Sequence, residues 1–209
     1  MNKLAVFDFD STLMAGETIA IIAGELGLRE EVEKATEKAM RGEADFFESL
    51  TARAALLKGL PISKVDEICR NLPYTKGAKE AIKALKKAGF TVLCFSGGFK
   101  NATGYAKGIL GYDGDFSNIF HVKNGLLTGY VGGEMMFSDS KGHMLKKMQS
   151  ILKVSPENTV AVGDGANDLS MFKYAATRVA FCAKDILKAQ ANVLIEEPDM
   201  SILPEILKL

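Results

Sequence analysis

The sequence has no excess of charge of either sign, because 26 lysine and arginine residues balance 26 aspartate and glutamate residues in a chain of 209. A protein without a net field does not favour nucleic acid or a membrane surface as its partner. No apolar run reaches the length of a membrane span, and Asp8 interrupts the short run near the N-terminus. These absences predict a soluble cytoplasmic protein.

Cysteine and histidine are also scarce, with three and two residues. The odd number of cysteines and their lack of metal-type spacing argue against a disulfide framework or a cysteine-based metal site. Cys94 and Cys182 lie in apolar runs, so we expect both to be small buried residues in a reducing compartment. His121 and His143 follow no pattern and are expected on the surface or on a hairpin.

What the chain does contain is a regular alternation of strand and helix patterns. Such alternation predicts an α/β fold, a Rossmann-like parallel sheet with helices on both faces. Asn124–Gly125, flanked by alternating apolar residues, predicts a hairpin. The expected strands are 4–7, 90–95, 117–122, 159–162, 178–182 and 192–195. The expected helices are 75–88, one from 99, 141–152, 167–174, 184–189 and one at the end of the chain.

The segment from Glu17 to Leu72 interrupts this alternation, because its apolar residues recur at helical spacing. Helices are expected at 30–40, 45–57 and 63–72. A chain of this length can bury one core with a smaller appendage. We therefore expect a Rossmann-like catalytic core made of residues 1–13 and 75–209, and a small helical cap domain, residues 14–74, inserted after the first strand.

Three of the predicted strands end in polar or glycine-rich sequence. Asp8 and Asp10 follow the first strand, Ser96-Gly97-Gly98 follows the second, and 163–168 (Gly-Asp-Gly-Ala-Asn-Asp) follows a third. Ligands of open α/β sheets bind beyond the carboxyl ends of the strands. The three segments are therefore expected to form one site at one edge of the sheet.

Asp8 and Asp10 can act in two ways at such an edge. As a pair they can ligate a cation, or they can divide the labour between a nucleophile and a general acid–base. Asp164 and Asp168 add hard oxygen ligands of the kind that Mg²⁺ prefers, with Asp8 as a further ligand. The alternatives are solvated acids at strand ends, a calcium-type loop or a plain helix N-cap.

Anion-binding groups are expected beside these acids. Ser96-Gly97-Gly98 is expected to open a helix, where free N–H groups and a hydroxyl form an anion cradle, although glycine pairs are common in such turns. Lys141 is predicted at the beginning of a helix, where the helix dipole disfavours a cation. That placement suggests an anion to neutralise, and a solvated lysine is the alternative.

Within the predicted cap, Arg53 shares an apolar helical stripe with Phe46 and Leu50. Either its stem runs along the apolar surface, or its guanidinium meets a carboxylate. Glu17 begins the first cap helix, where an acid is favourable in any case, so its role stays open. Met40 and Phe46 are of a type found more often in a core than in a pocket.

Together these segments resemble the four motifs of the haloacid dehalogenase-like hydrolases. The first motif is similar to residues 8–12 (Asp-Phe-Asp-Ser-Thr), the second to Ser96-Gly97-Gly98, the third to Lys141 and the fourth to residues 163–168. The resemblance spans nearly the whole chain and includes Glu17 and the helix of Arg53. It implies a magnesium-dependent phosphatase that converts O-phospho-L-serine to L-serine and phosphate, the last step of L-serine biosynthesis.

The resemblance also implies a role for each motif residue. Asp8 is implied as the nucleophile that becomes phosphorylated, Asp10 as the general acid–base, and Lys141 as a third catalytic residue. The implied Mg²⁺ ligands are Asp8, the Asp10 carbonyl, Asp164, and Asp168 directly or through water. The implied phosphoryl-binding groups are Ser96, a glycine N–H of Gly97 or Gly98, and Lys141, with Asn167 in support.

In the cap, the resemblance implies that Glu17 faces the substrate ammonium and Arg53 its carboxylate, with Met40 and Phe46 closing over the serine. The expected partner is this small molecule alone, with no nucleic acid or membrane, and the chain is expected to be a monomer or a weak homodimer. A phosphotransferase, a phosphatase for another small phosphomonoester, and a non-catalytic phospholigand-binding protein remain as alternatives.

Overall fold

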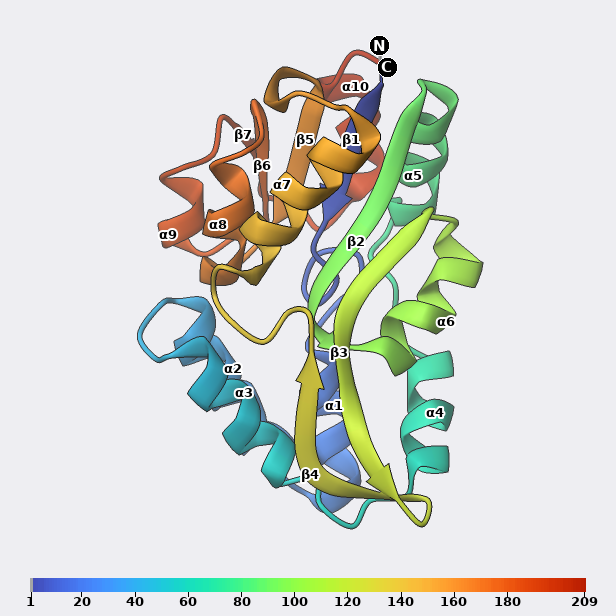
Figure 1. Ribbon diagram of the computed structural model, residues 1–209, viewed down its shortest axis with the longest axis vertical. Coiled ribbons are helices and arrows are strands. Elements are labelled where there is room, and N and C mark those ends of the chain that lie inside the picture. The colour runs from blue at the N-terminus through green and yellow to red at the C-terminus, as the bar shows by residue number, and fades with distance from the viewer. Residues whose placement is uncertain (1) are drawn as a thin grey trace.

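The computed structural model describes residues 2–209 and contains a seven-stranded sheet in the order β4-β3-β2-β1-β5-β6-β7 (Figure 1). The strands are β1 Lys3–Phe7, β2 Phe90–Phe99, β3 Gly114–Lys123, β4 Leu126–Gly133, β5 Thr159–Gly163, β6 Thr177–Phe181 and β7 Val193–Ile195. The longer helices are α1 Thr18–Ala23, α2 Arg29–Met40, α3 Phe46–Ala55, α4 Ile62–Arg70, α5 Ala78–Lys87, α6 Lys100–Leu110 and α7 Ser140–Leu152. The short helices α8 Leu169–Phe172, α9 Asp185–Lys188 and α10 Leu203–Ile206 follow.

The central strand β1 is buried on both faces because consecutive side chains point to opposite sides of a strand. Ala5 and Phe7 belong to the cluster formed with α5, α6 and α10. Leu4 and Val6 belong to the cluster formed with α7, α8 and α9. The predicted α/β fold with helices on both faces of the sheet is therefore confirmed (Figure 1).

Strands β2 and β5 both pair with β1 in parallel, so the carboxyl ends of these three strands share one edge. Helices α1 to α4, which leave the sheet after β1 and return before α5, gather beyond that edge (Figure 1). The three helices expected between residues 30 and 72 are present, with ends that differ by up to two residues. The division into a core and a cap remains a prediction.

The predicted hairpin is confirmed as β3 and β4, which pair antiparallel and make the sheet mixed rather than wholly parallel. Its turn holds Asn124 and Gly125, both at positive φ (53° and 77°), which is the geometry that favours Asn-Gly. Three backbone hydrogen bonds join the hairpin to residues 59–62, at the end of the connection between α3 and α4 and the start of α4, a contact we call the seam. They are Gly59 N to Leu127 O (2.8 Å), Leu127 N to Leu60 O (2.9 Å) and Ile62 N to Gly125 O (2.9 Å).

Three local predictions differ from the structure. Residues 96–98 belong to the end of β2, and α6 begins only at Lys100, so the glycine pair does not open a helix. The expected helix 167–174 is a 3-10 turn, Ala166–Asp168, followed by the four-residue α8. Cys182 was expected to be buried in a strand, but it follows β6 in a left-handed conformation (φ 44°) and is exposed.

Cys94 is buried, as expected. His121 lies on the hairpin beside Thr128, and His143 has an exposed side chain, which agrees with the prediction for both histidines. Within residues 2–209, no helix is long and apolar enough to cross a membrane.

Candidate active site

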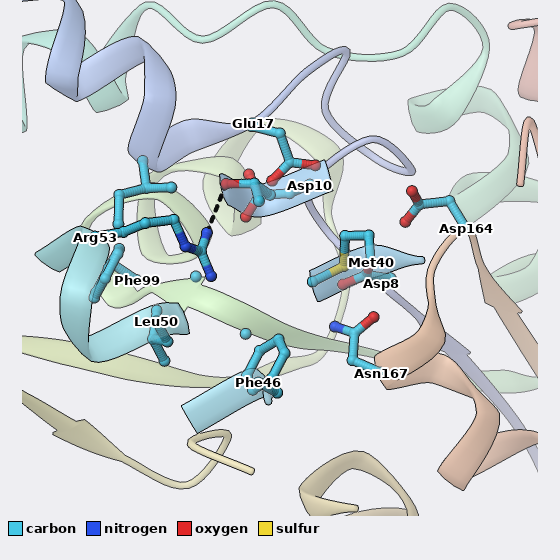
Figure 2. A pocket seen from close by; sticks show the side chains of 14 residues that line it. Asp8, Asp10, Glu17, Met40, Phe46, Leu50, Arg53, Phe99, Asp164 and Asn167 are labelled. Carbon is cyan, nitrogen blue, oxygen red and sulfur yellow. Dashed lines mark hydrogen bonds between the residues drawn. The ribbon is translucent and has the colours of Figure 1, made fainter. Parts of the chain in front are cut away.

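A small cavity lies between the shared edge of β1, β2 and β5 and the helices α1 to α3 (Figure 2). Fourteen residues line it: Asp8, Asp10, Glu17, Ile19, Thr36, Met40, Phe46, Leu50, Arg53, Gly97, Gly98, Phe99, Asp164 and Asn167. Three further residues singled out in the sequence, Ser96, Lys141 and Asp168, do not line the cavity but bond to residues at its wall. The structure therefore brings every predicted site residue to one place.

Asp8, the first residue after β1, is held in a fixed orientation. Its Oδ1 accepts a hydrogen bond from the Phe9 N–H (2.7 Å) and contacts Lys141 Nζ at 2.6 Å. Burial raises the pKa of Asp8, and the lysine opposes that shift. Since both of these contacts use Oδ1, the second carboxylate oxygen of Asp8 has no hydrogen-bond partner among residues 2–209 and is left for other chemistry.

Lys141 is a buried cation between two acids, with 2 % of its surface exposed. Its Nζ lies 2.6 Å from Asp8 Oδ1 and 2.6 Å from Asp168 Oδ1. Burial alone would lower the pKa of Lys141, but the two carboxylates raise it above its ordinary value. The ammonium therefore stays charged at the cavity wall, as the anion-neutralising interpretation of its helix position requires.

Asp168 uses its carboxylate to hold the loop after β5. Its Oδ1 binds Lys141, and its Oδ2 accepts the N–H groups of Asp164 (3.0 Å) and Gly165 (3.1 Å). A side chain at Gly163 would place its Cβ 2.3 Å from this carboxylate, so only glycine fits there. Burial, followed by Asp8, raises the pKa of Asp168 to about 6.

Asp164 differs from its neighbours because its carboxylate accepts no hydrogen bond from any residue in the described range, 2–209. Burial, with the nearby charges of Asp8 and Asp168, raises the pKa of Asp164 well above its usual value. Ligand atoms of these three acids lie within 4.8 Å of one another. An unpartnered buried carboxylate in a cluster of hard oxygen donors fits a divalent cation such as Mg²⁺.

Asp10 faces the cavity beside the first turn of α1. Its Oδ1 accepts hydrogen bonds from the backbone N–H (2.9 Å) and the hydroxyl of Thr18. Burial raises the pKa of Asp10, and the bonds from Thr18 lower it. The sequence reasoning missed Thr18, although a threonine at the start of a helix next to an acidic strand end is a usable signal.

Gly97 and Gly98 line the cavity from β2, and Ser96 directly precedes them in that strand. The buried Ser96 hydroxyl accepts the N–H of Gly98 (2.9 Å). A Cβ on Gly98 would lie 2.6 Å from Asp10 Oδ2, and a Cβ on Gly97 would lie 2.6 Å from Phe46 Cζ. Glycine at these positions is required by close packing around the cavity rather than by the helix start expected from the sequence.

The Arg53 guanidinium points into the cavity on the side of Asp10 and Glu17 (Figure 2), but the carboxylate contact that the sequence reasoning allowed for it is not found among residues 2–209. Only 4 % of the residue is exposed. Its nitrogens donate to Thr36 Oγ1 (2.7 Å) and Ser49 O (3.0 Å), and no carboxylate lies within ion-pair distance of it in residues 2–209. Burial lowers the pKa of this cation, and Glu17 opposes the shift. Thr36 is a second residue that the sequence reasoning missed.

Glu17 lies immediately before α1 and accepts a hydrogen bond from Ser11 Oγ (2.8 Å). Burial, and next the charge of Asp10, raise the pKa of Glu17 to about 8. A carboxyl group with this pKa gains strongly from a cation placed beside it. Glu17 therefore lines a cavity that favours a cationic group near it.

Met40 and Phe46 are both buried and both line the cavity, so they are core residues and pocket residues at the same time. They meet the sheet edge at glycines: the Cβ position at Gly165 lies 2.8 Å from Met40 Sδ, just as the one at Gly97 meets the Phe46 ring. Asn167 also lines the cavity, and its buried Oδ1 has no hydrogen-bond partner within residues 2–209.

Residues 2–176 match the sequence model of the haloacid dehalogenase-like hydrolases, and the chain belongs to this family of enzymes. Among its relatives is the phosphoserine phosphatase of Wolinella succinogenes, which is 60 % identical over 198 residues, 95 % of this chain and 96 % of the relative. The phosphoserine phosphatase of Methanocaldococcus jannaschii is 50 % identical over 207 residues, 99 % of this chain and 97 % of the relative.

Solved structures agree with this similarity. The phospho-aspartyl intermediate analogue of a phosphoserine phosphatase superposes with a TM-score of 0.94 at 50 % identity and covers 99 % of this chain and 98 % of that one. A substrate-bound phosphoserine phosphatase complex superposes with the same TM-score, 0.94, at 50 % identity and covers 100 % of this chain and 98 % of that one.

Proposed function

We propose that this enzyme hydrolyses O-phospho-L-serine to L-serine and phosphate, with Mg²⁺, through a phosphoaspartyl intermediate on Asp8, as the last step of L-serine biosynthesis. The observation that carries the proposal is the division of the cavity into two chemically different ends. Asp8 and Asp164 line one end, with Lys141 bonded to Asp8 behind them, and Arg53 and Glu17 face the other. A phosphate ester of an amino acid carries a phosphate at one end, for the first group of residues, and a carboxylate and an ammonium at the other, for Arg53 and Glu17.

Mg²⁺ fits the acidic end. Asp8, Asp164 and the Asp10 carbonyl would hold it, with Asp168 acting directly or, given the three hydrogen bonds its carboxylate already makes, through water. When bound, the ion offsets the negative charge of the phosphoryl group and of the attacking carboxylate.

In the first chemical step, Asp8 attacks phosphorus. Because Oδ1 is held by Phe9 and Lys141, the other oxygen forms the new O–P bond while the bond from phosphorus to the serine oxygen breaks. Asp10, whose raised pKa favours the protonated form, gives its proton to the leaving serine oxygen. The products of this step are L-serine and the phosphorylated Asp8.

In the second step, Asp10 takes a proton from water as the water oxygen attacks phosphorus. The O–P bond to Asp8 breaks, phosphate leaves, and both aspartates return to their first state. Lys141, the Ser96 hydroxyl and a glycine N–H of Gly97 or Gly98 bind the phosphoryl oxygens where charge accumulates, with Asn167 in support.

Substrate choice is assigned to the predicted cap. Arg53 binds the substrate carboxylate, which supplies the counter-ion that this buried guanidinium otherwise lacks. Glu17 faces the substrate ammonium, and Met40 and Phe46 close over the serine carbons. A phosphate ester without the amino-acid head would leave two buried groups unpaired, which is costly.

The deciding experiment compares turnover of O-phospho-L-serine, glycerol phosphate and sugar phosphates, each with Mg²⁺ and with a chelator. We expect turnover with Mg²⁺ only, and a clear preference for O-phospho-L-serine. Asp8→Asn removes the nucleophile and is the blank. Equal or better hydrolysis of glycerol phosphate would contradict the proposed substrate, and a phosphorylated alcohol among the products, when alcohols are added, would indicate a phosphotransferase.

A further inference from the structure

Asn118, in β3, has no role in the site described so far, yet it is fully buried next to the end of β2. Its side-chain amide makes three hydrogen bonds, all to backbone. Nδ2 donates to Gly97 O (3.0 Å) and to Met135 O (3.1 Å), and Oδ1 accepts the Met135 N–H (3.0 Å). One side chain therefore ties the glycine pair of β2 to the chain that follows β4.

The bond to Gly97 controls which way the neighbouring N–H points. The Gly97 carbonyl and the Gly98 N–H belong to one planar trans peptide, so they point in opposite directions. With its oxygen held by Asn118, this peptide turns the Gly98 N–H onto Ser96 Oγ (2.9 Å). An oxygen that accepts this N–H directs its own hydrogen elsewhere, which leaves the Ser96 hydroxyl free to donate to a bound anion.

The bonds to Met135 fix the backbone of the segment that leads to Lys141, the third anion-binding group. Met135 lies in the connection from β4 to α7, and Lys141 is the second residue of α7. The same connection is closed by the Phe137 N–H, which donates to Ser140 Oγ (3.1 Å). Asn118 therefore holds both backbone segments that bring hydroxyl, N–H and ammonium groups to the cavity.

Gly133, in the partner strand of the hairpin, leaves space for the Asn118 amide. Gly133 pairs directly with Asn118 and has a φ of +146°. A Cβ on Gly133 would lie 2.6 Å from Asn118 Cα and 2.7 Å from its Oδ1, so glycine leaves the room that the amide needs. An aspartate in place of Asn118 would keep this shape but would set oxygens against the carbonyls of Gly97 and Met135.

We propose that Asn118 is a positioning residue for the phosphoryl-binding groups, acting through the Gly97–Gly98 peptide and the Met135 backbone. The assignment rests on the proposed function, since it presumes that Ser96, the glycine N–H groups and Lys141 bind a phosphoryl group. Asn118 itself touches no substrate. Its loss misplaces donors whose alignment sets the rate, and displacement of about 1 Å is enough to cost on the order of a hundredfold.

The test uses the full chain with Mg²⁺ and compares Asn118→Asp and Asn118→Ala with the wild type. Inorganic phosphate is titrated calorimetrically, kcat and KM are measured for O-phospho-L-serine, and L-serine is tested as a competitive inhibitor. We expect the Kd for phosphate to rise about tenfold and kcat to fall by about ten- to a hundredfold, with the L-serine inhibition constant within about twofold of the wild type.

Gln149→Glu is the matched control. Gln149 is also a buried amide, and its Nε2 donates to Thr159 Oγ1 (2.9 Å) and Tyr174 O (2.7 Å) at a distance from the cavity lining. Its loss should lower the free energy of unfolding and leave the Kd for phosphate unchanged. The inference is overturned if a folded Asn118→Asp variant keeps the wild-type Kd for phosphate, or if phosphate and L-serine binding weaken together.

A measurement on the wild type covers the case in which the Asn118 variants do not fold. When phosphate is added to the isotope-labelled protein, the side-chain NH₂ resonances of Asn118 should shift and those of Gln149 should not; unshifted Asn118 resonances overturn the inference. A wild type that binds phosphate without hydrolysing O-phospho-L-serine would defeat the proposed substrate alone. A wild type that binds no phosphate would defeat both proposals.

Discussion

Arg53→Ala should lower kcat/KM strongly for a substrate that carries a carboxylate and only weakly for one that lacks it. Arg53 is 4 % exposed, and its guanidinium has only Thr36 and Ser49 as partners in residues 2–209, so a substrate carboxylate would be its one counter-ion. Hydrogen bonds to charged groups contribute about 1.5–3 kcal/mol, and breaking a buried ion pair costs about 3–5 kcal/mol. A loss of about 3 kcal/mol corresponds to a fall of roughly 150-fold in kcat/KM.

The assay pairs the variant with a second substrate. O-phosphoethanolamine keeps the phosphate and the ammonium of O-phospho-L-serine but lacks the carboxylate. For this ester we expect Arg53→Ala to lower kcat/KM by no more than about threefold, so the ratio of the two losses isolates the contribution of the carboxylate.

Arg41→Ala is the matched control for this experiment. Arg41 is also an arginine of the predicted cap, but its side chain is 54 % exposed and pairs with Glu37 at 2.7 Å on the surface. Surface pairs of this kind contribute about 0–1 kcal/mol, so neither substrate should be affected by more than about twofold. If Arg53→Ala reduced the turnover of both esters equally, Arg53 would have a structural role and the assignment of the cavity ends would be wrong.

Three further predictions concern the acids and the glycines. The folded protein keeps a proton on Glu17 up to about pH 8, whereas the unfolded chain releases it near pH 4.5. Between these values the folded state binds more protons than the unfolded state, so the free energy of unfolding should fall as the pH rises. The fall should be less steep in Glu17→Gln. In a chelator, Asp164→Asn should raise Tm by relieving repulsion with Asp8, and it should abolish the rise in Tm that Mg²⁺ produces in the wild type. Gly98→Ala, whose Cβ would lie 2.6 Å from Asp10 Oδ2, should lower kcat by about a hundredfold.

Each of these predictions has a clear contrary result. Denaturant titrations with the same pH slope in wild type and Glu17→Gln would show that Glu17 ionises normally. A thermal scan in which Mg²⁺ still stabilises Asp164→Asn would remove Asp164 from the metal site. Gly104→Ala is the control for Gly98→Ala, because it adds its Cβ to α6 with no atom within 4 Å; it should keep kcat and gain up to about 1 kcal/mol of stability. Equal kcat in both glycine variants would contradict the close contact with Asp10.

The sequence was sufficient for most of the sheet because a buried parallel strand has a simple signature. The apolar runs at residues 4–7 and 159–162 had to lie in the interior, and their polar ends had to share an edge. The same reasoning placed Asp8 and Asp164 together. It failed at Ser96-Gly97-Gly98, where the glycines continue β2 instead of opening a helix. Phe46 and Asp10, which come from distant parts of the chain, leave no room for a Cβ at these two positions.

Two of the residues that the sequence did not reveal, Thr36 and Asn118, have partners that are remote in the chain. Thr36 meets Arg53 from a different helix, and Asn118 reaches Gly97 across the sheet. Neither belongs to a short motif, so no spacing could indicate them. Cys182 was misplaced for a local reason, since the apolar pattern of β6 continues one residue beyond the point where the backbone turns.

The seam limits the ways in which the cavity can admit a substrate. Lifting the segment that links α3 to α4 away from the hairpin would break three backbone hydrogen bonds at once. A swing of α3 that kept those bonds would pivot about the seam, so Phe46, at the far end of α3, would move furthest. Phe46 is also the residue that packs against Gly97, so a swing of this kind would open the cavity above the glycines of β2.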